Sequence, residues 1–360
     1  GLGLVDPIRG ADFQARGLRA ALRVGDLRRV TRGLALHAGL VASHGPRANA
    51  RAMKQLARCA ELVASTNDPF LHGWVIGGTG FAHYLGGRFR VGAELLEQAV
   101  APLRHDTQGN IWELNTVRIF RLLALRQLGR WRELRAGLTE LLRDAVRRGD
   151  RYAETTLTRS ANLAWLVSDE PARARQQLAS ARWTPPEGGY HMQHWYELRA
   201  LAELALYEQD GAAARDLFAH AFDDLGRSLL LRVQTIKTEA LWLRGRAALL
   251  RCALGEDPAL TADAADAARR LDREGVGYAR VWARMLDAGV AAQRGDAAAA
   301  RARLDEAAAL AREAELMMCW AAARLAQDDP RGEELMAAEG VKQPLRMLQV
   351  LLPGVRRPDG

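Results

Sequence analysis

The stretch WARMLDAGVAAQRGDAAAARARLDEA, residues 282–307, decides the fold. Trp282 stands thirteen positions ahead of Gly295, a glycine that ends a helix-like run. The same interval recurs in two other places: Trp74 to Gly87 and Trp242 to Gly255. Because one spacing is used three times, the sequence predicts a repeated structural unit.

Three further registers share this interval, although they lack the tryptophan. They run from Thr116 to Gly129, from Thr156 to Asp169 and from Tyr196 to Gln209. Successive turns are 40 to 46 residues apart, a period typical of stacked helical repeats. Six units are therefore expected, each ending its first helix at one of these turns.

The helix after each turn has its own pattern, with small, large and small residues five, nine and twelve positions on. Four units follow it: Gly92, Leu96, Ala99; Ala174, Leu178, Ala181; Ala214, Phe218, Ala221; Ala300, Leu304, Ala307. Two depart from it: Leu134, Leu138, Leu141 and Leu260, Ala264, Ala267. These spacings keep the residues on one helical face, where small side chains let a neighbouring helix approach. The pattern resembles the second helix of the tetratricopeptide repeat, in a longer unit.

The expected fold is all-α, a right-handed superhelical array of tetratricopeptide-like helix pairs with a repeat of about 40 residues. The chain of 360 residues is 49% hydrophobic and 26% charged, and Ala, Leu and Arg favour helix throughout. Turn residues predict three parts: a basic helical segment at 1–66, six repeats at 67–318, and capping helices with a tail at 319–360.

The composition also indicates where the protein works. No apolar run approaches the roughly 18 residues of a membrane span, and the start shows no secretory signal. A cytoplasmic location without membrane contact is therefore expected. Cys59, Cys252 and Cys319 lie far apart without a CxxC pair, so we expect buried, reduced thiols rather than disulfides or a zinc ribbon.

The net charge of +8 is concentrated at the N-terminal end, since residues 1–60 hold eleven Lys or Arg and three Asp. A basic stripe, consisting of Arg47, Arg51, Lys54 and Arg58, lies at helical spacing opposite Met53, Leu56, Ala60 and Val63. Such a stripe suits docking of an acidic domain, a phosphorylated segment or nucleic acid. A solvated face is the favoured interpretation, and direct contact with nucleic acid is not expected, because no aromatic residues interleave the stripe.

Catalytic motifs are missing from the sequence. It has no GxxxxGK[ST], no VAIK-like lysine, no HRD and no DFG. The glycines of residues 77–80 are interpreted as sites of close helix packing. His191 and His194 share a spacing that would suit a metal, but no third ligand is near, so capping and aromatic packing are favoured. The chain is expected to be no enzyme and to need no metal or cofactor.

The aromatic slot ahead of each turn has two interpretations. In one, Trp74, Tyr196, Trp242 and Trp282 line a partner-binding groove with Arg159 and Arg199. In the other, the longer unit shifts the register, so that these aromatic side chains pack in the core between neighbouring repeats. The core is favoured, because large aromatic side chains bury well and an exposed row would be adhesive.

Several stretches resemble the C-terminal region of large bacterial serine/threonine protein kinases. They are LVD at 4–6, IRGADF at 8–13, IWEL at 111–114, HMQH at 191–194, RSLLLRVQ at 227–234, QPLRM at 343–347 and LPG at 352–354. Those proteins join a kinase domain, a signal-transduction P-loop ATPase and a helical repeat array. The resemblance covers essentially the whole chain and includes no catalytic signature.

The resemblance implies a regulatory or sensor arm that binds a partner or its own upstream ATPase and kinase domains. The chain then reads as part of a longer polypeptide, and enzyme activity would belong to the rest of it. Two alternatives stay open. One is the effector-sensing repeat region of an ATP-dependent transcription activator, and the other is a metal enzyme that uses His191 and His194.

Overall fold

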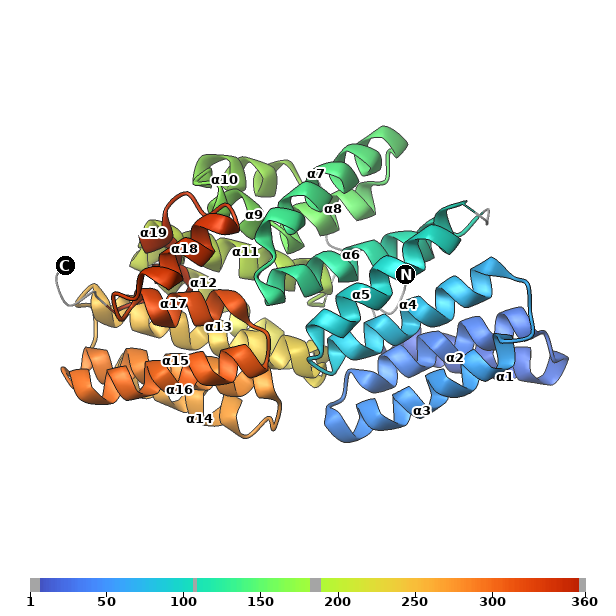
Figure 1. Cartoon of the computed structure of the whole chain (residues 1–360), viewed down its shortest axis with the longest axis horizontal. Coiled ribbons are helices and arrows are strands. Elements are labelled where there is room, and N and C mark those ends of the chain that lie inside the picture. Colours follow the sequence, from blue (N-terminus) through green and yellow to red (C-terminus); the bar gives the residue numbers. More distant parts are fainter. Residues whose placement is uncertain (1–6, 106–108, 182–188, 356–360) are drawn as a thin grey trace. The chain divides into compact units, whose positions relative to one another are not determined.

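The computed structural model describes residues 7–105, 109–181 and 189–355, and within them the chain is helical without any β-strand (Figure 1). The expected all-α class is confirmed. The chain forms two compact units. Unit 1 comprises Gly1–Leu125 and Leu229–Thr235, and unit 2 comprises Arg126–Ser228 and Ile236–Gly360. The boundary passes through two helices, α6 (Ile111–Leu128) and α13 (Gln234–Ala253).

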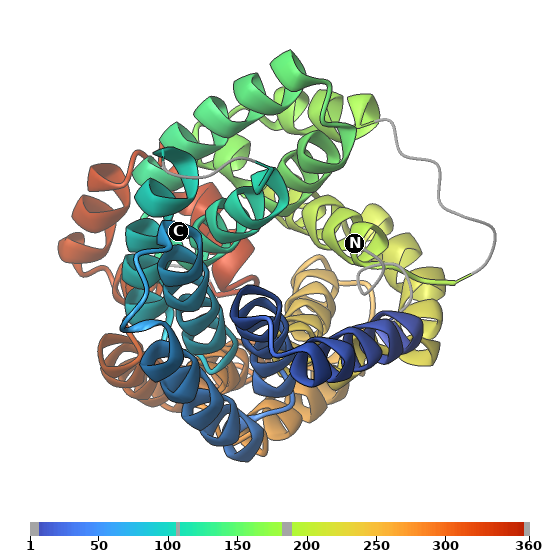
Figure 2. The same cartoon turned by 90° about the vertical axis from the view of Figure 1, so that its right-hand side faces the viewer.

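Unit 1 is a row of helices that pack on their neighbours in chain order, coloured blue to teal in Figures 1 and 2. Its helices before α6 are α1 (Pro7–Val24), α2 (Leu27–Ala42), α3 (Pro46–Val63), α4 (Pro69–Leu85) and α5 (Phe89–His105). The three helices predicted before residue 66 are thus present. Asp26 and Asp68 cap α2 and α4 by accepting backbone N–H groups, which supplies the partners that a helix start lacks.

Unit 2 is also built of helices that pack on their neighbours. They are α7 (Trp131–Arg148), α8 (Arg151–Ser160), α9 (Leu163–Val167), α10 (Pro171–Ser180), α11 (Met192–Glu208), α12 (Gly211–Arg227), α14 (Leu260–Asp272), α15 (Gly277–Gln293), α16 (Ala297–Glu313), α17 (Met317–Leu325), α18 (Pro330–Ala338) and α19 (Pro344–Leu351). Several of them are short, such as α9, α17, α18 and α19. Neighbours such as α15 and α16 pack as antiparallel pairs. None of the described helices is long and apolar enough to cross a membrane.

All six predicted turns are confirmed by the backbone. Each turn residue has a left-handed φ: Gly87 77°, Gly129 78°, Asp169 56°, Gln209 59°, Gly255 78° and Gly295 77°. After five of them the next N–H reaches back to a carbonyl five residues earlier, as from Asp296 to Ala291 at 3.0 Å and from Asp210 to Ala205 at 2.9 Å. This bond closes the end of a helix and lets the chain reverse.

In the four units that follow the small-large-small pattern, the three slots are buried wherever the structure describes them. Ala300, Leu304 and Ala307 on α16 are buried, and the corresponding residues of α5 and α10 are buried too. The side chains of Phe218 and Ala221 lie outside the described residues. In the two departing units, Leu134 and Leu138 are buried but Leu141 is only partly covered, and Ala264 and Ala267 are buried but Leu260 is not. The helix contacts there use two of the three slots.

The structure corrects two details of the sequence interpretation. The run from Thr156 to Asp169 is not one helix, because it breaks after Ser160 and resumes at Leu163. At the break, the buried Asn162 amide donates to the carbonyl of Ala174 on α10 at 3.1 Å. On α3, Ala60 is exposed and Cys59 is buried, so the apolar face is rotated by one residue from the predicted one.

Candidate functional site

The six predicted groove residues are buried side chains. Trp74 lies in unit 1, where its indole N–H donates to the carbonyl of Arg32 at 3.2 Å and its ring contacts Trp112. The other five lie in unit 2. Trp242 and Trp282 stack in parallel with their ring centroids 4.6 Å apart, and Tyr196 is covered as well. The aromatic slot thus contributes to helix packing, which is the core interpretation.

The two arginines of that set are buried with charged or polar partners. Arg199 pairs with Glu239 at 2.7 Å and donates to the carbonyl of Ser160 at 2.8 Å. Arg159 pairs with Glu197 at 3.0 Å. A buried guanidinium needs such partners, because its desolvation is expensive. Both side chains therefore join helices within unit 2.

A buried ionic cluster extends these pairs through unit 2. We define it as Arg126, Arg199, Arg246, Glu203 and Glu239, all less than a tenth exposed. Arg126 contacts both carboxylates, and Arg246 lies 4.0 Å from Glu203. Burial lowers the pKa of Arg246 to about 10. The cluster connects α6, α11 and α13, which lie far apart in the sequence and come together only in the folded chain. No sequence motif predicted it.

Arg246 also holds the C-terminal part of unit 2. Its guanidinium lies 3.8 Å from the ring centroid of Trp242 and donates to the carbonyl of Val350 at 2.8 Å. Gln293 donates to the carbonyl of Gly354 at 2.8 Å. These bonds tie the end of the chain to α13 and α15, while the final helix, α19, packs on α11 and α17.

His191 and His194 form a helix cap. The ring of His194 accepts the backbone N–H of His191 at 2.9 Å at the start of α11. Tyr190 stacks on His194 with centroids 5.0 Å apart, and burial lowers the pKa of His194. In the described residues no three His, Cys, Asp or Glu side chains gather as metal ligands would. Capping and aromatic packing thus describe what these histidines do in the structure.

The basic stripe of α3 is exposed along its whole length. Arg47, Arg51, Lys54 and Arg58 all face solvent. Arg58 pairs with Glu61 at 2.6 Å on the same helix, whereas the other three form no ion pair with the described part of the chain. The opposite face of α3 is buried against α2 and α4. The stripe is therefore an available cationic surface on a rigid helix.

Two of the three cysteines are buried as expected. Burial raises the pKa of Cys59 to about 11 and that of Cys319 to about 12, which makes both thiols unreactive at neutral pH. Cys252 is partly exposed at the end of α13.

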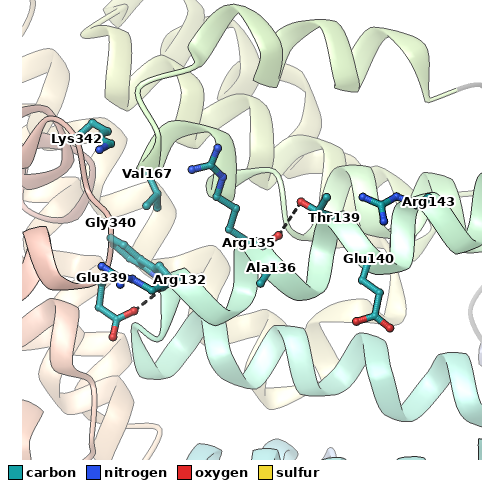
Figure 3. A pocket seen from close by; sticks show the side chains of 11 residues that line it. Arg132, Arg135, Ala136, Thr139, Glu140, Arg143, Val167, Glu339, Gly340 and Lys342 are labelled. Atoms are coloured by element: carbon teal, nitrogen blue, oxygen red, sulfur yellow. Dashed lines mark hydrogen bonds between the residues drawn. The ribbon is translucent and has the colours of Figure 1, made fainter.

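A basic pocket of about 530 Å³ opens in unit 2 beside α7, and neither charge patterning nor motifs predicted it (Figure 3). Its lining residues are Trp131, Arg132, Arg135, Ala136, Thr139, Glu140, Arg143, Val167, Glu339, Gly340 and Lys342. Four of these side chains are cationic and two are acidic. One wall is α7, and the opposite wall is the loop between α18 and α19.

The cations and the carboxylates of this pocket point in different directions. Arg135, Thr139 and Arg143 project from one side of α7, since they are four residues apart, and Glu140 projects from the other side (Figure 3). Glu339 accepts the backbone N–H of Arg132 at 3.1 Å. The open side of α7 is therefore positive.

Comparison with known proteins gives no family for this geometry. No family model matches the chain, and no curated protein matches it. The positions of the exposed cations and of the buried ion pairs are therefore the evidence for function. It offers two separate surfaces, the stripe on α3 in unit 1 and the pocket beside α7 in unit 2.

Proposed function

We propose that the chain is a non-catalytic interaction and regulatory module of a bacterial serine/threonine protein kinase. In this proposal it is a right-handed superhelical array of tetratricopeptide-like helix pairs in the cytoplasm. The observation that carries the proposal is the set of six left-handed turns at intervals of 40 to 46 residues, each closing the first helix of a pair. Arrays of this type present long surfaces to protein partners.

The distribution of polar chemistry supports a binding role. The charged residues of the buried ionic cluster and the two capping histidines are used in packing, as their contacts describe. The unpaired cations, by contrast, lie on exposed helix faces. Exposed charge on a rigid scaffold steers an oppositely charged partner and fixes its orientation.

The proposed partner surface is the basic stripe on α3, and the proposed partner is an acidic face of the upstream ATPase or kinase domains of the same polypeptide. Three of its cations, Arg47, Arg51 and Lys54, have no carboxylate within 4.0 Å among the described residues. An acidic partner would therefore gain charge pairs without breaking existing ones. Association through exposed charges weakens as salt rises.

The first test is the parent gene. We expect it to encode HRD and DFG motifs upstream of this chain, together with a P-loop ATPase. A helix-turn-helix in their place would favour the transcription-activator alternative, and the absence of kinase motifs would overturn the kinase assignment.

The second test measures binding of the chain to its purified upstream region over a salt titration. We expect the charge reversals Arg51→Glu and Arg58→Glu together to weaken binding at least tenfold at low salt. The matched control reverses Arg273 and Arg301, two exposed arginines of unit 2 that form no ion pair in the described chain. Equal affinity of the parent and the stripe variant, or equal weakening by the control, would overturn the docking surface.

A further inference from the structure

The pocket beside α7 has its cations on two walls that are distant in sequence. Arg135 and Arg143 stand on α7, and Lys342 stands on the loop between α18 and α19. The side chains of Arg143 and Lys342 are exposed and pair with no carboxylate in the described residues. Two cations that face one space without a counterion favour an anionic ligand from outside.

The walls are fixed in place before any ligand arrives. The backbone N–H of Lys342 donates to the carbonyl of Val167 at 3.0 Å, and Arg346, one turn into α19, pairs with Asp169 at 3.4 Å. On the other wall, Arg135 pairs with Glu170 at 3.2 Å. Because these walls are already ordered, binding does not incur the free-energy cost of ordering them.

The distance between Arg135 and Arg143 along α7 indicates which kind of anion fits the pocket. Arg135 and Arg143 are eight residues apart on one face of α7, so their positions along the axis differ by about 12 Å at 1.5 Å per residue. An extended peptide advances about 3.3 Å per residue, so acidic side chains four residues apart are separated by about 13 Å and lie on the same side of the peptide. A single small anion meets only one of these two arginines.

The volume agrees with a peptide rather than an ion. The pocket of about 530 Å³ falls inside the range of about 300 to 1,000 Å³ that is usual for sites of organic ligands. Its lining also includes the exposed side chain of Ala136, which offers apolar contact between the charges, whereas Trp131 and Val167 are almost fully covered. A segment with both carboxylates and hydrocarbon stems matches that lining.

We propose that this pocket binds an acidic protein segment in extended conformation, whose carboxylates pair with Arg135, Arg143 and Lys342. The site is separate from the stripe on α3, so it does not depend on the proposed contact with upstream domains. The pair with Glu170 positions the guanidinium of Arg135, and Glu170 also pairs with Arg173 at 2.9 Å, so two arginines share this one carboxylate. The other two cations of the pocket, Arg143 and Lys342, have no carboxylate partner among the described residues.

The experiment uses the full chain and fluorescein-labelled pentaglutamate, with binding followed by fluorescence anisotropy at low salt. Diglutamate, triglutamate, pentaglutamine and inorganic phosphate are the competitors. We expect saturable binding of pentaglutamate, weaker competition by each shorter peptide, and negligible competition by pentaglutamine or phosphate. Arg143→Glu with Lys342→Glu should weaken binding at least tenfold, and Arg143→Gln with Lys342→Gln should give an intermediate loss.

The control variant reverses Arg273 and Arg301, which changes the net charge equally and lies in the same unit. It should bind within twofold of the parent. Circular dichroism establishes that each variant keeps its helix content, and the glutamine variant serves if the glutamate variant fails to fold. The proposal is overturned by absence of saturable pentaglutamate binding, by equal losses in control and pocket variants, or by phosphate competing as well as the peptide.

Discussion

Neutralising Glu239 is expected to destabilise unit 2 strongly, because its carboxylate has three partners and two of them are buried arginines. Arg199 lies 2.7 Å from it, Arg126 lies 3.8 Å from it, and the amide of Gln127 donates to it. At an effective dielectric constant of about 20, the two ion pairs are worth about 6 and about 4 kcal/mol in Coulomb energy. Desolvation of the carboxylate offsets part of this attraction, and breaking a buried pair typically costs about 3 to 5 kcal/mol. We therefore expect Glu239→Gln to lower the free energy of unfolding by about that amount.

Urea unfolding followed by circular dichroism measures this change. The matched control is Asp266→Asn, which removes a carboxylate whose pair with Arg269 at 3.0 Å is more than half exposed. Such a pair contributes less than about 1 kcal/mol. Adding Arg199→Met to Glu239→Gln should cost less than the sum of the single changes, because the orphaned charge is gone. Equal losses in Glu239→Gln and Asp266→Asn would refute the reasoning.

Three further predictions concern packing, pH and thiols. Gly332→Ala would place a methyl group against the carbonyl of Ala321, so we expect it to lower the free energy of unfolding in urea by about 1 to 3 kcal/mol. At Gly17 an added methyl group meets nothing within 4 Å, so Gly17→Ala should raise the free energy of unfolding. Burial, with a contribution from Arg88, lowers the pKa of His83 from 6.5 to about 4. Between pH 6.5 and pH 4 the unfolded chain therefore binds a proton at His83 that the folded chain does not, so the free energy of unfolding falls as the pH drops through this range. His83→Gln should make the urea midpoint fall less steeply over the same range. A thiol-reactive dye at pH 8 should label Cys252 first; faster labelling of either buried cysteine would contradict the packing around it.

The turns were predictable from sequence because a turn depends on a few adjacent residues. Gly295 followed by Asp296 supplies both the left-handed conformation and the next helix cap, since Asp296 accepts the backbone N–H of Ala299 at 2.9 Å. Even Gln209, which lacks the freedom of glycine, was located by its distance from Tyr196. Local chemistry and one spacing were enough for the helix pairs.

The pocket and the buried ionic cluster were not predictable in this way. Arg143 and Lys342 line one pocket because the loop between α18 and α19 is bonded to α9, through the N–H of Lys342 and the carbonyl of Val167. Arg199 and Glu203 read as ordinary helix-surface charges until Arg126 and Glu239 are brought against them. A single sequence carries no signal for such pairings, because each side chain alone fits an exposed face as well.

Two backbone bonds between distant residues set the order in which the chain can finish folding during its synthesis. In unit 1, the carbonyl of Ser43 accepts the N–H of Gln234, and in unit 2 the carbonyl of Val167 accepts that of Lys342. At about 5 to 20 residues per second, a ribosome needs roughly 10 to 40 s to reach each later partner. Until then the carbonyls of Ser43 and Val167 lack their final partners, and water is the substitute donor at these two places.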